Sequence, residues 1–133
     1  MSKITPPPPL DGYTIYDPVD PFENEAGPFY WRRLDDGSHH FVLRTEPRHA
    51  NSHNVIHGGL LMTMADLTMA VTAKGEPDDA YVTVAFNSEF VAAGFAGDLV
   101  ESRGELVRRT GSMAFIRGRI HVGETTLFVC SAV

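Results

Sequence analysis

The segment from Gly58 to Lys74 most constrains the fold of this chain, because it predicts a long helix that is apolar on nearly every side. Gly75 follows directly and Pro77 comes just beyond, a usual pattern after a helix C-terminus. Such a helix must be covered over most of its surface. Its single carboxylate, Asp66, is a poor helix former and is costly to bury unless it is paired or hydrogen-bonded. Because exceptions of this kind are often functional, Asp66 is the first candidate site residue.

Short apolar or alternating runs on both sides of this helix predict strands. Turn-forming residues such as those at 35–37 separate them, which is a usual hairpin composition. The expected strands cover residues 29–34, 40–45, 81–91, 99–108, 112–122 and 125–132. One long helix and about five to six strands predict an α+β domain in which a curved antiparallel sheet wraps the helix.

The chain has 133 residues, which fits one domain. We expect residues 1–27 to form an extended, proline-rich N-terminal arm and an irregular lead-in, and residues 28–133 to form the single domain. The hydrophobic content of 43% and the charged content of 21% are those of an ordinary globular protein, so disordered and fibrous classes are excluded.

Charge and cysteine content limit the partners and the compartment. The formal net charge of -6 argues against nucleic acid, because phosphate binding requires a basic surface. A single cysteine, Cys130, excludes an internal disulfide and is expected to be a buried apolar group. We find neither a secretory signal nor a run of the roughly 20 apolar residues that a membrane span needs. A cytoplasmic location is therefore expected.

Three residues at the predicted helix start, His57, Gly58 and Gly59, indicate a site of backbone donors. Gly58 has no Cβ, so a ligand can approach its N–H closely. At a helix N-terminus that N–H has no partner within the helix, and the helix dipole adds positive charge, so a developing oxyanion would be stabilised there. A tight turn into the helix explains the same residues equally well.

Asp66 lies eight residues after Gly58, which is about 12 Å along a helix axis. One chain therefore cannot apply both residues to the same carbonyl carbon. If both act on one substrate, they come from two subunits whose helices pack antiparallel, and the site lies at an interface. The alternative is a structural Asp66 that holds a neighbouring loop through backbone N–H groups.

Two further polar residues are candidates. The amide of Asn51 could position a water or a substrate carbonyl, although an isolated loop asparagine is also a common turn former. Thr83, on the expected strand after the helix, could hydrogen-bond Asp66 or the water, although threonine is also common in strands without any function.

A metal site is not expected. His49, His53 and His57 recur every four residues, a spacing that lines up ligands on a helix. The residues between and beside them, such as Asn54, make a helix unlikely there, and neither a cysteine nor a paired carboxylate completes a ligand set.

The combined spacing of Asn51, His57-Gly58-Gly59 and Asp66 resembles the signature of hotdog-fold thioesterases of the phenylacetic-acid-degradation (PaaI-like) type. The resemblance extends from about residue 27 to residue 132. It continues after the helix, in Val82-Thr83-Val84, Asn87, Phe90 and Gly97-Asp98. It implies the hotdog fold, a long helix wrapped by an antiparallel sheet, with subunits dimerised edge to edge and often assembled into tetramers.

The resemblance also implies roles for these residues. Asp66 would be the general base or nucleophile, and the Gly58 N–H would polarise the thioester carbonyl. His57 would support the substrate or the turn, Asn51 would orient the lytic water or the carbonyl from across the dimer, and Thr83 would supply a hydroxyl that assists the carboxylate.

Two departures stand out. Asn54 replaces the usual glycine but tolerates positive φ, and Thr83 replaces the usual serine.

We therefore expect a cytoplasmic hydrolase, an acyl-CoA thioesterase without cofactor or metal, that forms a homodimer or homotetramer and binds neither nucleic acid nor membrane. Its substrate phosphates require cations, and four arginines near a predicted hairpin turn are candidates or merely a solvated surface: Arg108, Arg109, Arg117 and Arg119.

The alternatives are a non-catalytic acyl-CoA binding or sensing module and a hotdog dehydratase, for which His57 would be the proton shuttle. The acyl group stays open, since apolar residues such as Met62 and Phe86 could line a tunnel or form core.

Overall fold

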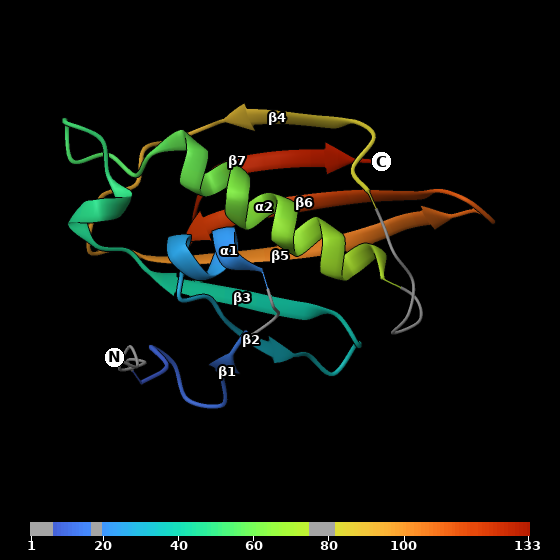
Figure 1. Ribbon diagram of the computed structural model, residues 1–133, viewed down its shortest axis with the longest axis horizontal. Coiled ribbons are helices and arrows are strands. Elements are labelled where there is room, and N and C mark those ends of the chain that lie inside the picture. The colour runs from blue at the N-terminus through green and yellow to red at the C-terminus, as the bar shows by residue number, and fades with distance from the viewer. Residues whose placement is uncertain (1–6, 17–19, 75–81) are drawn as a thin grey trace.

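The computed structural model describes residues 7–16, 20–74 and 82–133. Its central feature is helix α2 (Gly58–Ala73), which lies across one face of a seven-stranded sheet (Figure 1). A short helix, α1 (Pro21–Ala26), lies beside α2, and a 3-10 turn covers Pro47–His49. The strands are β1 (Thr14–Ile15), β2 (Tyr30–Arg33), β3 (His39–Arg44), β4 (Phe86–Phe90), β5 (Leu99–Arg109), β6 (Ala114–Val122) and β7 (Thr125–Ala132).

The sheet has the order β1-β2-β3-β5-β6-β7-β4, and every neighbouring pair is antiparallel. This confirms the predicted α+β architecture of a helix wrapped by a curved antiparallel sheet, with seven strands where five to six were expected. β4 directly follows the segment after α2, yet it pairs with β7 at one edge. It is shorter than the predicted strand at 81–91, because residues 82–85 lead into it without forming a strand and residue 81 lies outside the described residues.

Close approach of the helix to the sheet depends on two glycines that face each other on β5 and β6, Gly104 and Gly118. A Cβ on Gly118 would lie 2.1 Å from Cε of Met69, and one on Gly104 would lie 2.3 Å from Oγ1 of Thr72. Because these positions carry no side chain, α2 packs directly on the backbone of the sheet. The buried side chains of the helix complete this contact: Leu60, Leu61, Met64, Ala65, Leu67, Thr68, Met69 and Ala73.

One stripe of α2 is not covered within a single chain. Met62, Asp66 and Ala70 follow one another at four-residue intervals, so they share a face, and all three are exposed. The expectation that Asp66 is buried among its apolar neighbours is therefore wrong for one chain. Its carboxylate sits on the one side of the helix that the sheet leaves open, where it avoids the cost of desolvation.

The lead-in packs two tyrosines on the sheet. Tyr13 is buried with Tyr30 and Val42, and the ring of Tyr16 contacts Trp31 edge to face. Phe22, in α1, is instead 69% exposed. The predicted proline-rich arm falls partly on residues 1–6, outside the described residues.

Cys130 is a buried free thiol in β7, as the sequence predicts. Burial raises the pKa of this thiol to about 11, which keeps it protonated and unreactive at neutral pH. None of the helices within residues 7–16, 20–74 and 82–133 could span a membrane.

Candidate functional site

The loop before α2 is a tight, hydrogen-bonded turn. Asn54 has a φ of 62°, which is the left-handed conformation. Asparagine tolerates this conformation, so it can stand where the family usually has glycine. Asn51 closes the turn through its side-chain oxygen, which accepts from the N–H groups of His53 at 2.9 Å and Val55 at 3.2 Å. The turn-forming role of Asn51 is therefore real, and its exposed NH2 group is the part of the side chain available to a ligand.

His57 caps the helix. Its Nδ1 accepts a hydrogen bond from the N–H of Gly59 at 2.8 Å, so Nδ1 carries no proton in this arrangement. Among the described residues, the Gly58 N–H has no hydrogen-bond partner, as expected of the first residue of a helix. A Cβ on Gly58 would lie 2.9 Å from Cε1 of Phe90, so glycine is required for this ring to lie against the helix start.

Asp66 is joined to Thr83, as predicted. The hydroxyl of Thr83 donates to Oδ1 of Asp66 at 3.0 Å. Thr83 lies in the segment just before β4 and not on the strand itself. The backbone beside it is held by the hydrogen bond from the Val84 N–H to the Val133 carbonyl, at 2.8 Å. The bond from Thr83 holds the orientation of an exposed carboxylate and leaves its second oxygen, Oδ2, for another partner.

A hollow of about 430 Å³ opens beside Asp66. The open stripe of α2, the helix α1 and the start of β4 surround it. Its lining residues are Asp20, Phe22, Glu23, Met62, Thr63, Asp66 and Phe86. Asp66 is one of three carboxylates at the wall of this partly apolar hollow and the one that α2 contributes, a position suited to proton abstraction from a water or to attack on an acyl carbon.

Glu23 is a residue of this hollow that the sequence did not reveal. Burial raises the pKa of its carboxyl to about 7, and the negative charges of Asp20 and Asp66 add to the effect. Asp20 caps α1 by accepting from the Glu23 N–H at 3.2 Å, which fixes Glu23 in the first turn of that helix. The only sequence signal was the pattern Asp-Pro-Phe-Glu, which is typical of a capped helix start. This pattern does not indicate which part of the fold the helix faces.

Within one chain the predicted residues form two groups. Asn51, His57 and Gly58 gather at the start of α2, while Asp66 and Thr83 lie two turns further along. The rise of a helix over these eight residues, about 12 Å, keeps the two groups apart.

The predicted absence of a metal at His49, His53 and His57 has a structural basis at His49. Its Nε2 bonds to the Ala26 carbonyl at 2.6 Å, and its Nδ1 accepts from the Glu46 N–H at 3.0 Å. Both ring nitrogens thus attach the end of α1 to the loop before α2 and are not available as ligands.

The four arginines do not share one location. Arg109 donates to the Ala73 carbonyl at the end of α2. Arg117 and Arg119 border a second hollow of about 890 Å³, to which Lys74 and Arg103 also contribute. Arg108 is exposed and borders neither hollow. Asp66 does not line that second hollow, so these cations and the carboxylate occupy different places on the chain.

The fold and the sequence as a whole match known proteins. Residues 53–129 match the family model described as the thioesterase superfamily. A Pseudomonas aeruginosa protein named "Putative esterase PA0474" is 31% identical over 115 residues, which cover 85% of this chain and 86% of that protein. A phenylacetic acid degradation-related protein of Ralstonia eutropha JMP134 is 26% identical with a TM-score of 0.74, over 87% of this chain and 89% of that chain.

A third protein resembles this chain in fold and was solved with CoA. It is BH2602 of Bacillus halodurans, 19% identical with a TM-score of 0.67, over 77% of this chain and 69% of that chain. The family match covers more than half of the sequence, and the resemblance to the phenylacetic-acid-degradation type is confirmed. The chain belongs to the thioesterase superfamily and has the hotdog fold.

Proposed function

We propose that this protein is an acyl-CoA thioesterase that hydrolyses a thioester to a free acid and CoA. The observation that carries the proposal is the Asp66 carboxylate, exposed at a hollow of about 430 Å³ and held by the Thr83 hydroxyl. Membership of the thioesterase superfamily supports the reaction class. The Bacillus halodurans protein solved with CoA supports CoA as the thiol part of the substrate.

In the proposed reaction, Asp66 acts as general base or as nucleophile. As base, it takes a proton from a water whose oxygen attacks the carbonyl carbon; the C–S bond then breaks and the thiolate leaves with that proton. As nucleophile, the carboxylate attacks the carbon, the C–S bond breaks and the thiolate leaves; water then hydrolyses the resulting anhydride, which gives the free acid and restores the Asp66 carboxylate, and the thiolate takes up the proton that the water releases. In both cases the Gly58 N–H donates to the carbonyl oxygen as its negative charge grows. The Asn51 amide orients the water or the carbonyl.

Completion of this site requires a second subunit, because Gly58 and Asp66 of one chain are about 12 Å apart. We place them together at an interface between antiparallel α2 helices, in a dimer that pairs edge to edge and further assembles into a tetramer. Support comes from the edge strand β4 and its surroundings, where large apolar side chains are exposed in one chain: Val82, Val84, Phe90, Val91 and Phe95.

The test is release of free thiol from a panel of aromatic and aliphatic acyl-CoA thioesters. The variant Asp66→Asn keeps the size of the side chain and an oxygen to accept from Thr83, but removes the base. We expect it to reduce turnover by roughly 100-fold or more, with an unchanged circular dichroism spectrum. The matched control, Asp35→Asn, changes an exposed carboxylate in the β2–β3 turn and should keep full activity.

Equal activity of Asp66→Asn and the wild type would refute the assignment. Thermal stabilisation by an acyl-CoA without thiol release would identify a binding module instead. Conversion of a 3-hydroxyacyl-CoA without thiol release would identify a dehydratase. His57 uses Nδ1 to cap α2, so Nε2 is the nitrogen that such a reaction would use.

A further inference from the structure

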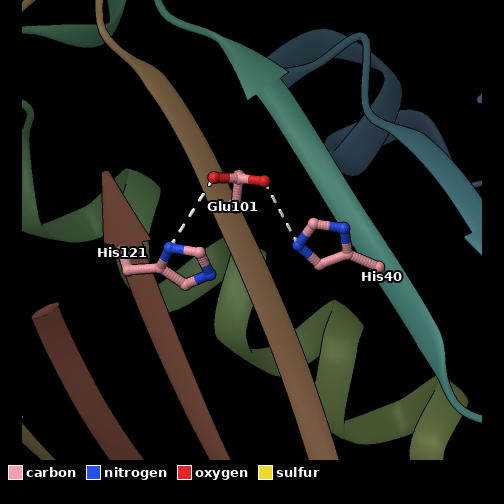
Figure 2. Close-up of side chains that lie close together, drawn as sticks. All are labelled: His40, Glu101 and His121. Carbon is pink, nitrogen blue, oxygen red and sulfur yellow. Dashed lines mark ion pairs between the residues drawn. The ribbon is translucent and has the colours of Figure 1, made fainter. Parts of the chain in front are cut away.

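Three side chains that the thioesterase site does not use converge on the sheet face opposite α2. They are His40 on β3, Glu101 on β5 and His121 on β6 (Figure 2). Nε2 of His40 lies 3.5 Å from Oε1 of Glu101, and Nδ1 of His121 lies 3.6 Å from Oε2. One ligand atom from each residue can be chosen so that all three lie within 4.8 Å of one another. The carboxylate therefore stands between two imidazoles.

Strand register brings these residues together. Glu101 pairs directly with His121 on one side and with Val42 on the other, and directly paired residues share a face. His40 lies two residues before Val42, so it projects to that face as well. Since the intervening Phe41 belongs to the core beneath α2, the His40 face is the opposite one. The two imidazole rings are nearly parallel, at 17°, with centroids 6.2 Å apart.

We propose that His40, Glu101 and His121 form a binding site for a divalent first-row transition-metal ion, represented by Zn²⁺. Two imidazole nitrogens and one carboxylate oxygen are a ligand set that Zn²⁺ takes in proteins, with further positions left for water or another ligand. Tetrahedral ligands at zinc distances are about 3.4 Å apart. The 3.5 Å between His40 Nε2 and Glu101 Oε1 already matches. The nitrogen of His121 nearer to the carboxylate is Nδ1, at 3.6 Å from Oε2, so the ring of His121 must shift to present its Nε2 to the ion.

The contacts on the far side of each imidazole are those of a metal ligand. Nδ1 of His121 lies 2.8 Å from the Gly123 carbonyl, which can only accept, so Nδ1 carries the proton and Nε2 has a free lone pair. In Figure 2 this second nitrogen is on the side of the ring that faces His40. Nδ1 of His40 bonds to the Tyr13 hydroxyl, which holds the ring with Nε2 toward Glu101. Such outer hydrogen bonds typically orient metal-binding histidines.

The site is accessible and selective. The side chains of His40, Glu101 and His121 are 14%, 20% and 16% exposed, so they are largely desolvated but open to an ion. His40 and His121, but not Glu101, border the hollow of about 890 Å³, which also reaches residues of α2 such as Thr72. Arg103 and its directly paired neighbour Arg119 add positive charge to this face, and Asp36 pairs with Arg103. The site offers two imidazoles and one carboxylate, whereas Mg²⁺ and Ca²⁺ require several oxygen ligands. Metals that bind imidazole are therefore favoured over Mg²⁺ and Ca²⁺.

The test is isothermal titration calorimetry of Zn²⁺ into full-length protein prepared without a polyhistidine tag and first treated with a chelator. We expect one Zn²⁺ per chain and an increase in Tm on binding. The variants His121→Gln and Glu101→Gln should each weaken binding by at least about tenfold. The matched control, His53→Gln, changes an exposed histidine in the loop before α2 and should bind as the wild type does.

Two further measurements keep the proposal testable if one variant folds poorly. Bound Co²⁺ should give visible absorption bands in the wild type that are absent in Glu101→Gln. Tyr13→Phe, which retains the buried ring, should weaken Zn²⁺ binding by up to roughly 10–100-fold through the freed His40. Absence of Zn²⁺ and Co²⁺ binding, or equal Zn²⁺ binding by well-folded His121→Gln, would overturn the proposal. These outcomes are independent of thiol release, because the site does not depend on the proposed thioesterase activity.

Discussion

At the level of residues, the contact that most directly links structure to chemistry is the hydrogen bond from Thr83 to Asp66. An exposed carboxylate on a helix can rotate freely, and a catalytic group works best when its orientation is fixed. The short segment between the undescribed residues and β4 supplies the donor that fixes it. The side-chain hydroxyl, and not the threonine methyl group, should therefore determine activity.

Replacing Thr83 tests this directly. Thr83→Val keeps the shape but removes the donor, so we expect kcat to fall by roughly 10-fold or more, the usual cost of a hydrogen bond to a charged group. Thr83→Ser keeps the hydroxyl and should stay close to wild-type activity. Thiol release measured at saturating acyl-CoA separates the two variants. Equal kcat values for Val and Ser would show that the hydroxyl has no part in the reaction.

Glu23 predicts a pH dependence of stability. Burial and its acidic neighbours raise the pKa of its carboxyl from 4.5 to about 7, so the folded chain holds a proton that the unfolded chain loses. Stability should therefore fall as pH rises from about 4.5 through 7. Glu23→Gln imitates the protonated form, so its Tm should match the wild type near pH 4.5 and exceed it by a few °C, roughly, at pH 8.

The control for this experiment is Glu124→Gln, in the exposed β6–β7 turn, which should show no pH-dependent difference from the wild type. Thermal unfolding followed by circular dichroism at four pH values between 4.5 and 8 gives the comparison. A Tm difference for Glu23→Gln that is the same at every pH would contradict the raised pKa.

At the level of elements, the sequence predicted most of the fold because strong patterns coincide with element boundaries. Continuous apolar periodicity identified α2 from its first residue, and turn residues separated β2 from β3 and β5, β6 and β7 from each other. β1 was missed because it has two residues and exists through its pairing with β2. The expectation that Asp66 is buried was wrong for one chain. The helix is apolar on nearly every side, so the sequence pattern does not indicate which side stays exposed.

The packing of α2 on the sheet gives a prediction at this scale. Gly118→Ala places a methyl group 2.1 Å from Cε of Met69 and 3.0 Å from Sγ of Cys130, so the helix or these side chains must shift. We expect a loss of roughly 1–3 kcal/mol in the free energy of unfolding, the usual cost of overpacking a core. Gly111→Ala is the matched control, because a Cβ there meets no atom within 4 Å. Equal midpoints in urea unfolding would show that the sheet adjusts without cost.

At the level of the whole molecule, strand pairing and helix packing bring together residues that are far apart in the sequence, and local sequence patterns do not predict these contacts. The cluster of His40, Glu101 and His121 escaped sequence analysis because its members are far apart in the chain and meet through the register of three strands. Glu23 escaped for the same reason, since nothing near it in sequence indicates that α1 faces Asp66. The spacing of Gly58 and Asp66 along a helix was predictable, because a helix has a fixed rise per residue.

That spacing makes assembly a condition for catalysis, which a substitution at the sheet edge can test. Val91 follows β4 directly and is 57% exposed in one chain, among the apolar side chains that the proposed dimer covers. In a twofold interface Val91→Lys brings two like charges into an apolar contact, so we expect monomers by analytical ultracentrifugation and at least a tenfold loss of thiol release. Val107→Lys, at a position 50% exposed near the far end of β5, should leave both properties unchanged. A Val91→Lys protein that is monomeric and fully active would show that one chain contains a complete site.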